Sequence, residues 1–144
     1  MPLSPSIQKT IIDHLPSKLI MFGEDDLDEE DFLNEIFFSL DPSKTLVFIS
    51  NGRKLIADLE QMSDHELPCL IVLDYNMPEL NGAEILNILK QNSRYDDIPK
   101  IVWSTSGSEV YKIKCLESGA LDYLIKPSKI KELEDIARNL LSFC

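Results

Sequence analysis

Side chains capable of chemistry stand directly after several short apolar runs of the chain. Glu24 and Asp25 follow one such run, and Asp74 ends another. Ser104 follows a third run and Lys126 a fourth. Carboxylates, a hydroxyl and an amine of this kind can together bind a cation and a phosphoryl group, provided that the fold brings them to one place.

The acidic members of this set predict a metal site. Several carboxylates within a few ångströms of one another cannot all ionise cheaply unless a cation lies among them. Oxygen ligands without histidine suit a hard divalent ion, Mg²⁺ or Mn²⁺. Such an ion beside one carboxylate favours transfer of a phosphoryl group to it, and Asp74 is the natural acceptor. We expect Lys126 to neutralise the phosphoryl oxygens and Ser104 to donate a hydrogen bond to them.

These residues can meet only if the chain forms a parallel sheet. Continuous apolar runs are typical of strands buried on both faces, and here each is followed by a helical pattern. The runs cover residues 19–22, 46–49, 69–73, 101–103 and 123–125, and the helical patterns cover 27–40, 55–62, 83–89, 110–116 and 130–141. This alternation predicts an α/β fold with helices on both faces of a parallel sheet. Ligands of such sheets bind outside the carboxyl ends of the strands, where the polar residues fall.

At these positions the sequence resembles the response-regulator receiver domain of two-component signalling. The resemblance rests on Glu24-Asp25, on Asp74 within LIVLDYNMPELNG, on Ser104 within VWSTS and on Lys126-Pro127 within GALDYLIKP. It covers residues 18–142 and implies a flavodoxin-like, doubly wound (βα)5 fold with strand order 2-1-3-4-5. Residues 1–17 lie outside it, and we expect an N-terminal extension that is either a short helix or a loosely docked tail.

The resemblance also implies how the acidic residues act. Asp74 would be the phosphorylated residue. Glu24, Asp25 and Asp74 would hold the metal, and Asn76 would add a backbone carbonyl ligand. Glu24 stands where the family more often has aspartate, and its longer arm would reach the metal through water.

The resemblance implies a switch on the neighbouring strands. Ser104 and Tyr123 would form the switch pair, and Lys126 would contact the phosphoryl group through a cis Lys126–Pro127 peptide bond. The plainer interpretation of Tyr123 is a half-buried aromatic residue of a strand. Its place three residues before Lys126 favours the switch.

Other acidic residues near the site have a simpler explanation. Asp26, Asp28 and Glu29 begin a helical pattern, and carboxylates there favour the helix macrodipole. A calcium-binding loop starting at Asp26 would need glycine where Asp31 stands and glutamate where Phe37 stands, so that interpretation fails.

Composition narrows the classes of function. The chain has 144 residues, enough for one domain, with 14 basic and 25 acidic residues and a net charge of −11. Such a charge repels nucleic acids and anionic membrane surfaces. No apolar run is long enough to span a membrane, and the N-terminal residues lead us to expect no secretory signal.

The three cysteines are odd in number and contain no CxxC pair. This spacing predicts neither a zinc site nor a full disulfide framework. Cys69 and Cys115 lie among apolar neighbours, and we expect them to be buried free thiols. A reducing compartment and a cytoplasmic location follow from that expectation.

The favoured function is a phosphorylation-controlled signalling switch and not an enzyme beyond its own phosphorylation and slow dephosphorylation. A histidine kinase or phosphotransfer domain would phosphorylate Asp74. The new charge would draw Ser104 inward, let Tyr123 rotate and reshape the surface around residues 110–116 and 123–125. Because no output domain follows the last helical pattern, we expect output through contact with an unidentified protein or onward phosphotransfer.

Two alternatives remain open at this point. One is a receiver-fold module that binds partners without phosphorylation, which would leave the carboxylate, hydroxyl and lysine set unexplained. The other is an aspartyl-phosphate phosphatase of the haloacid-dehalogenase type. Such enzymes use a second aspartate as acid and base two residues on, and here that position is Asn76, which cannot exchange protons.

Overall fold

The computed structural model describes residues 2–8 and 17–144 of the chain. Five parallel strands form one sheet in the order β2-β1-β3-β4-β5. The strands are β1 (Leu19–Gly23), β2 (Thr45–Ile49), β3 (Leu70–Asp74), β4 (Lys100–Ser104) and β5 (Asp122–Ile125). The predicted α/β fold and its strand order 2-1-3-4-5 are thereby confirmed.

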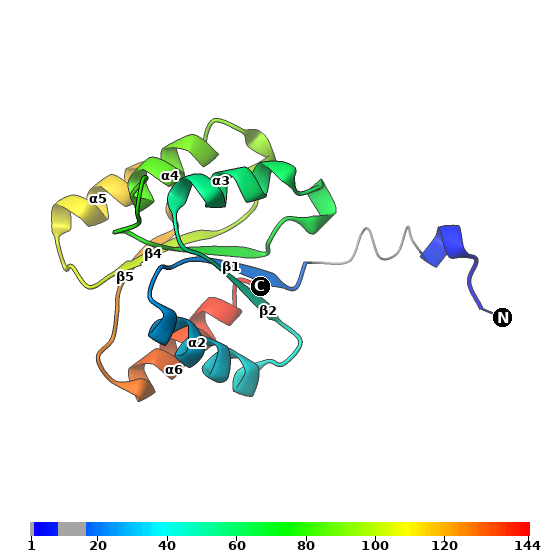
Figure 1. Cartoon of the computed structure of the whole chain (residues 1–144), viewed down its shortest axis with the longest axis horizontal. Helices are drawn as coiled ribbons and strands as arrows, with labels where there is room; N and C mark the ends of the chain where they lie inside the picture. The colour runs from blue at the N-terminus through cyan, green and yellow to red at the C-terminus, as the bar shows by residue number, and fades with distance from the viewer. Residues whose placement is uncertain (1, 9–16) are drawn as a thin grey trace.

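The helices occupy the predicted connections. They are α2 (Leu27–Leu40), α3 (Gly52–Gln61), α4 (Gly82–Leu89), α5 (Glu109–Glu117) and α6 (Ile130–Leu141), with short 3₁₀ turns η1 (Asp64–Glu66) and η2 (Ser93–Tyr95). Helices α3, α4 and α5 cover one face of the sheet, and α2 and α6 cover the other (Figure 1). Residues 5–8 form an exposed helical turn, and residues 9–16 of the expected extension lie outside the described residues.

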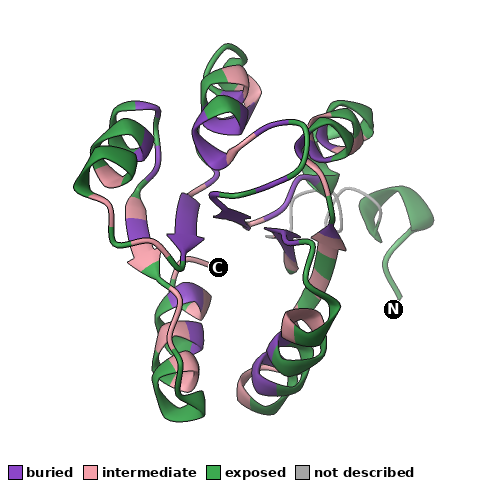
Figure 2. Ribbon diagram, turned by 60° about the vertical axis from the view of Figure 1, so that its left-hand side comes forward, coloured by how far each residue is buried: buried purple, intermediate pink, exposed green. Residues whose placement is uncertain are grey.

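The inner strands of the sheet are buried (Figure 2), and their alternate residues build two hydrophobic cores. Met21 and Ile71 face the core under α3, α4 and α5, whereas Phe22 and Val72 face the core under α2 and α6. The period of two in side-chain direction explains why β1 and β3 read as unbroken apolar runs. Trp103 joins the second core as a packing residue.

Strand β2 was predicted to be buried on both faces, and it is not. It lies at the edge of the sheet, and of its five residues only Ile49 is fully buried. Thr45 and Val47 are exposed. An apolar run predicts a strand here correctly, but it does not distinguish an edge from a centre.

The loop after β3, which leads into α4, is packed closely against the start of α3. The Gly52 N–H donates to the Pro78 carbonyl at 3.2 Å. A Cβ atom at Gly52 would lie 2.6 Å from the Leu80 Cβ, so only glycine permits this approach. The contact holds the loop that follows Asp74 in place.

The cysteines differ from the prediction. A disulfide joins Cys69, just before β3, to Cys144, beyond the end of α6. The expectation of a free thiol at Cys69 is therefore wrong, because α6 returns Cys144 to the amino end of β3 despite a separation of 75 residues. Cys115 is a buried free thiol, as predicted. The cysteines thus no longer argue for a reducing compartment.

No helix in the described part of the chain is long and apolar enough to cross a membrane.

Candidate functional site

Three carboxylates meet at the carboxyl edge of the sheet. Glu24 and Asp25 directly follow β1, and Asp74 ends the neighbouring β3. One carboxylate oxygen from each residue lies within 4.8 Å of the others. Glu24 is fully buried and Asp74 is 8% exposed, whereas Asp25 is open to solvent. The site is thus anchored inside and accessible from one side.

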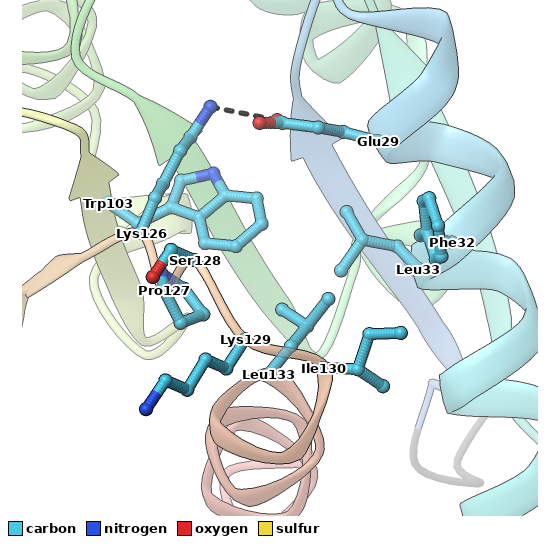
Figure 3. A pocket seen from close by; sticks show the side chains of 10 residues that line it. All are labelled: Glu29, Phe32, Leu33, Trp103, Lys126, Pro127, Ser128, Lys129, Ile130 and Leu133. Atoms are coloured by element: carbon cyan, nitrogen blue, oxygen red, sulfur yellow. Dashed lines mark hydrogen bonds and ion pairs between the residues drawn. The ribbon is translucent and has the colours of Figure 1, made fainter.

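Lys126, immediately after β5, is the cation of this cluster. Its Nζ donates to Glu24 Oε2 at 3.0 Å and to Asp74 Oδ2 at 3.0 Å. It also donates to Glu29 Oε2 at 2.8 Å, the contact drawn in Figure 3. The same ammonium lies 5.0 Å from the centre of the Trp103 ring. The side chain is 9% exposed, and three carboxylates and an aromatic face surround its ammonium.

Glu29 is the residue that sequence reasoning missed. It lies in the first turn of α2, and its helix start also explains the acidic residues around it: the Asp26 side chain caps α2 by accepting from the Asp28 and Glu29 N–H groups. Asp26 is thus a capping residue of α2, and the macrodipole interpretation is incomplete for Glu29, whose carboxylate reaches across to Lys126. One sequence feature could have identified Glu29 as a site residue. It lies about one turn after the Glu24-Asp25 pair, on a predicted helix that begins at the carboxyl edge of the sheet.

Burial and pairing set the electrostatics. Burial raises the pKa of Glu24 to about 8; the nearby Glu29 side chain adds to the rise and Lys126 opposes it. The Glu24 Oε1 accepts the backbone N–H groups of Asp25 and Asp26, each at 3.1 Å. Burial alone would lower the pKa of Lys126, but its hydrogen bonds to Glu29, Asp74 and Glu24 outweigh that and raise it. Lys126 is therefore a permanent cation.

Asp74 is held at its backbone and at its side chain. The Asn76 N–H donates to Asp74 Oδ1 at 3.1 Å, which leaves Oδ2 to Lys126. The N–H of the next residue, Tyr75, donates to the Trp103 carbonyl of β4 at 3.2 Å. The predicted ligand Asn76 thus stands beside Asp74, with an exposed side chain.

Ser104 and Tyr123 meet through a third residue. Ser104 is fully buried, and its Oγ accepts the Ser106 N–H at 3.1 Å. The Tyr123 hydroxyl, on a ring that is 6% exposed, donates to the Ser106 carbonyl at 2.7 Å. The predicted switch pair therefore shares the loop after β4 as a common partner. Among the described residues, Ser104 makes no hydrogen bond to Asp74.

The expected cis peptide bond before Pro127 is wrong. The described residues contain no cis peptide bond. The Lys126 N–H donates to the Ser104 carbonyl at 2.8 Å, which continues the β4–β5 pairing by one residue. From that position the trans backbone already directs the Lys126 side chain to the carboxylates.

A groove opens beside Lys126, between α2 and α6 (Figure 3). Its walls are mainly apolar, and the residues that line it include Phe32, Leu33, Trp103, Ile130 and Leu133. Phe32 and Ile130 are 49% and 58% exposed, so an apolar surface leads up to the charged cluster.

The donor set fits a divalent cation. It consists of carboxylate oxygens, with the buried Glu24 and Asp74 on one side and the exposed Asp25 on the other. Oxygen ligands of this kind suit hard ions, and one open side leaves room for water and a substrate oxygen.

The chain matches the response regulator receiver domain family over residues 21–138 and belongs to it. It is 30% identical over 131 residues to the response regulator Rcp1 of Synechocystis sp., covering 89% of each chain. It is 35% identical over 72 residues to the two-component response regulator ARR5 of Arabidopsis thaliana, covering 39% of that longer protein. Receiver domains of this family are phosphoacceptor switches of two-component signalling and take phosphate from histidine kinases.

Solved structures agree. The phosphorylated cyanobacterial phytochrome response regulator RcpA superposes with a TM-score of 0.77 at 25% identity, over 87% of this chain and 91% of that one. The Mn²⁺-bound form of Rcp1 gives 0.76 at 30% identity, over 88% and 94%. The flavodoxin-like receiver fold is thereby shown, and a relative with the same fold holds a divalent cation.

Proposed function

We propose that Asp74 is the phosphoacceptor of this receiver domain. The observation that carries the proposal is the placement of Asp74 Oδ2 3.0 Å from the ammonium of Lys126, within a carboxylate cluster whose third member, Asp25, is exposed to solvent. A phosphoryl group on Asp74 brings three further oxygens to that place, and Lys126 is the cation that can pair with them.

Mg²⁺ is the proposed metal, with Mn²⁺ as its substitute. Glu24, Asp25 and Asp74 would hold it together with the backbone carbonyl of Asn76. The metal supplies charge neutralisation for the transferred phosphoryl oxygens. The cluster of Glu24, Asp25 and Asp74 supports this role, because three carboxylates carry more negative charge than the single ammonium of Lys126 neutralises.

The proposed donor is a histidine kinase or a histidine phosphotransfer domain. A carboxylate oxygen of Asp74 attacks phosphorus, an oxygen–phosphorus bond forms, and the phosphorus–nitrogen bond of the donor histidine breaks, leaving its imidazole. The ammonium of Lys126 exchanges its contact with the Asp74 carboxylate for contacts with the negatively charged phosphoryl oxygens. Asn76 cannot act as a general base, so hydrolysis of the product is slow. The chain is accordingly a regulatory domain that at most catalyses its own phosphorylation and dephosphorylation.

Ser104 and Tyr123 are the proposed switch. Ser104 exchanges its contact with Ser106 for a hydrogen bond to the phosphoryl group, and the loop after β4 moves with it. Tyr123 then loses its Ser106 partner and rotates. The surface that changes is apolar and exposed on α5 and β5, at Val110, Ile113, Leu116 and Ile125, which supports output by protein–protein contact.

We also propose that residues 18–142 are the functional domain and residues 1–17 an extension, and that the protein acts in the cytoplasm. The family match over residues 21–138 supports the domain boundaries. Cytosolic histidine kinases and phosphotransfer domains would then be within reach. The net charge of −11 opposes direct binding to nucleic acids.

The test is intact mass after incubation with acetyl phosphate and Mg²⁺. We expect one added phosphoryl group, absent with EDTA and absent in Asp74→Asn. Asp58→Asn is the matched control, because Asp58 lies on α3 and pairs with Lys54 at 2.7 Å, away from the site. Phosphorylation retained in Asp74→Asn would reject Asp74 as the acceptor. No adduct under any condition would favour a phosphorylation-independent binding module.

A further inference from the structure

The pair Cys69 and Cys144 lies at the end of the sheet opposite the phosphoacceptor. Cys69 precedes β3, and Asp74 ends the same strand five residues later, about 17 Å away at the rise of a strand. The two cysteines therefore belong to a different region from the carboxylate cluster. Nothing in the signalling chemistry requires them.

Hydrogen bonds hold both cysteine backbones where the sulfurs can meet. The Cys69 N–H donates to the Leu19 carbonyl of β1 at 2.9 Å. The Cys144 N–H donates to the Leu141 carbonyl at 3.1 Å, which extends the last turn of α6. The Cα atoms of the pair are 5.2 Å apart, within the range that a disulfide needs. The proximity is thus built into the fold.

The surroundings allow the pair to react. Both residues are half-buried, so a small reagent can reach them. The Lys44 Nζ donates to the main-chain oxygen of Cys144 at 3.1 Å, which helps to hold this residue beside Cys69. Cys115 is the opposite case: it is fully buried, and burial raises the pKa of its thiol to about 11.

We propose that Cys69 and Cys144 are a reversible redox site, closed by exchange with a low-molecular-weight disulfide of the glutathione type. One cysteine thiolate attacks a sulfur of the reagent, forms a mixed disulfide and releases one thiol. The other cysteine thiolate then attacks the Sγ of the first cysteine, so that the internal disulfide forms, the bond to the reagent's sulfur breaks and the second thiol is released. The protein loses two electrons and two protons, and the reagent gains both. Oxidation fastens the end of α6 to the start of β3, and reduction releases it.

The closed form restrains a long segment. The bond joins residues 75 positions apart, and such a link removes many conformations from the unfolded chain. Helix α6 also packs against α2 and forms a wall of the groove beside Lys126. We expect the oxidised protein to melt about 5–15 °C above the reduced protein. We also expect amide exchange in the last turn of α6 to slow on oxidation.

The test counts free thiols in the full chain. The protein is equilibrated with mixtures of reduced and oxidised glutathione. It is then unfolded and alkylated with a maleimide, and the number of labels is obtained from its intact mass. We expect three labels in the reducing mixture and one, on Cys115, in the oxidising mixture. Peptide mapping should locate the Cys69–Cys144 link, and dithiothreitol should reverse the change in melting temperature.

Matched variants sharpen the result. Cys69→Ser and Cys144→Ser should each abolish the internal link and the redox-dependent shift in melting temperature, whereas Cys115→Ala should keep both. Three labels at every glutathione ratio, a link through Cys115, or a bond between two chains would overturn the proposal. Phosphorylation by acetyl phosphate is measured on both forms, so a failure of the redox site is distinguishable from a failure at Asp74.

Discussion

Two buried lysines lie at opposite ends of the sheet, and they differ in what surrounds them. Lys126 follows β5 at the carboxyl edge, where Glu24, Glu29 and Asp74 all accept from its Nζ. Lys100 begins β4 at the amino edge, and its Nζ donates to the Tyr95 carbonyl at 2.6 Å.

The pKa of each lysine reflects these neighbours. Burial lowers the pKa of Lys100, and the more distant Asp96 and Asp97 only partly oppose that. Burial acts on Lys126 in the same direction, but three hydrogen-bonded carboxylates reverse the result. The difference teaches that burial of a lysine is no sign of function by itself. The number of carboxylates that it holds together is the informative feature.

The largest expected effect comes from removing each ammonium in turn. Lys126→Met should slow phosphorylation by acetyl phosphate about 100-fold, because the developing phosphoryl charge loses its protein cation. Lys100→Met should leave that rate within about twofold, since Lys100 contacts only a backbone carbonyl far from Asp74. Initial rates from intact mass measure both. Equal losses of phosphorylation rate in the two variants would show that Lys126 has no special role in the reaction compared with Lys100.

The next effect is a pH dependence confined to the carboxyl edge. A divalent cation binds the ionised form of Glu24, whose pKa is raised to about 8, chiefly by burial. Below that pH the metal must displace a proton, so Mg²⁺ affinity should fall by up to about tenfold per pH unit as the pH drops, and should level off above about 8. Calorimetric titration of Mg²⁺ across this range measures it.

Two variants test the origin of that pH dependence. Glu24→Gln should flatten the profile, because its amide does not titrate. Lys100→Met should keep the profile of the parent protein. A profile unchanged by Glu24→Gln would show that another group controls metal binding.

The smallest expected effect concerns Glu29, which adds a fourth carboxylate to the carboxyl edge. Glu29→Gln should weaken Mg²⁺ binding about fivefold, because the ammonium of Lys126 loses a counter-charge and repels the incoming cation more strongly. Glu35→Gln is the charge-matched control on the same helix; Glu35 is exposed, forms no ion pair within the described chain, and should change the affinity less than twofold. Equal losses of Mg²⁺ affinity in the two variants would show that Glu29 acts only through the overall negative charge of the surface.

Much of this arrangement is predictable from the sequence, because strands in a parallel sheet share one carboxyl edge. Residues at strand ends, such as Asp74 and Ser104, follow from apolar runs that stop abruptly. Glu29 does not follow from them, since its reach depends on the direction in which α2 leaves the sheet. The Cys69–Cys144 link was missed for a related reason: a separation of 75 residues says nothing about which elements end side by side.

The central place of β3 has a consequence for how the molecule can move. Its five residues are all buried, and it pairs with β1 on one side and β4 on the other, so the backbone that carries Asp74 is the stationary part. Helix α5 is its counterpart, with Cys115 as its buried residue and with Tyr111 stacked on Tyr75 at 4.4 Å between ring centres. A displacement of α5 can therefore proceed without breaking a strand pair, on the microsecond to millisecond timescale of sliding helices. The Tyr75–Tyr111 stack, and not the strand pairing of the sheet, would then be a contact that a moving α5 has to break.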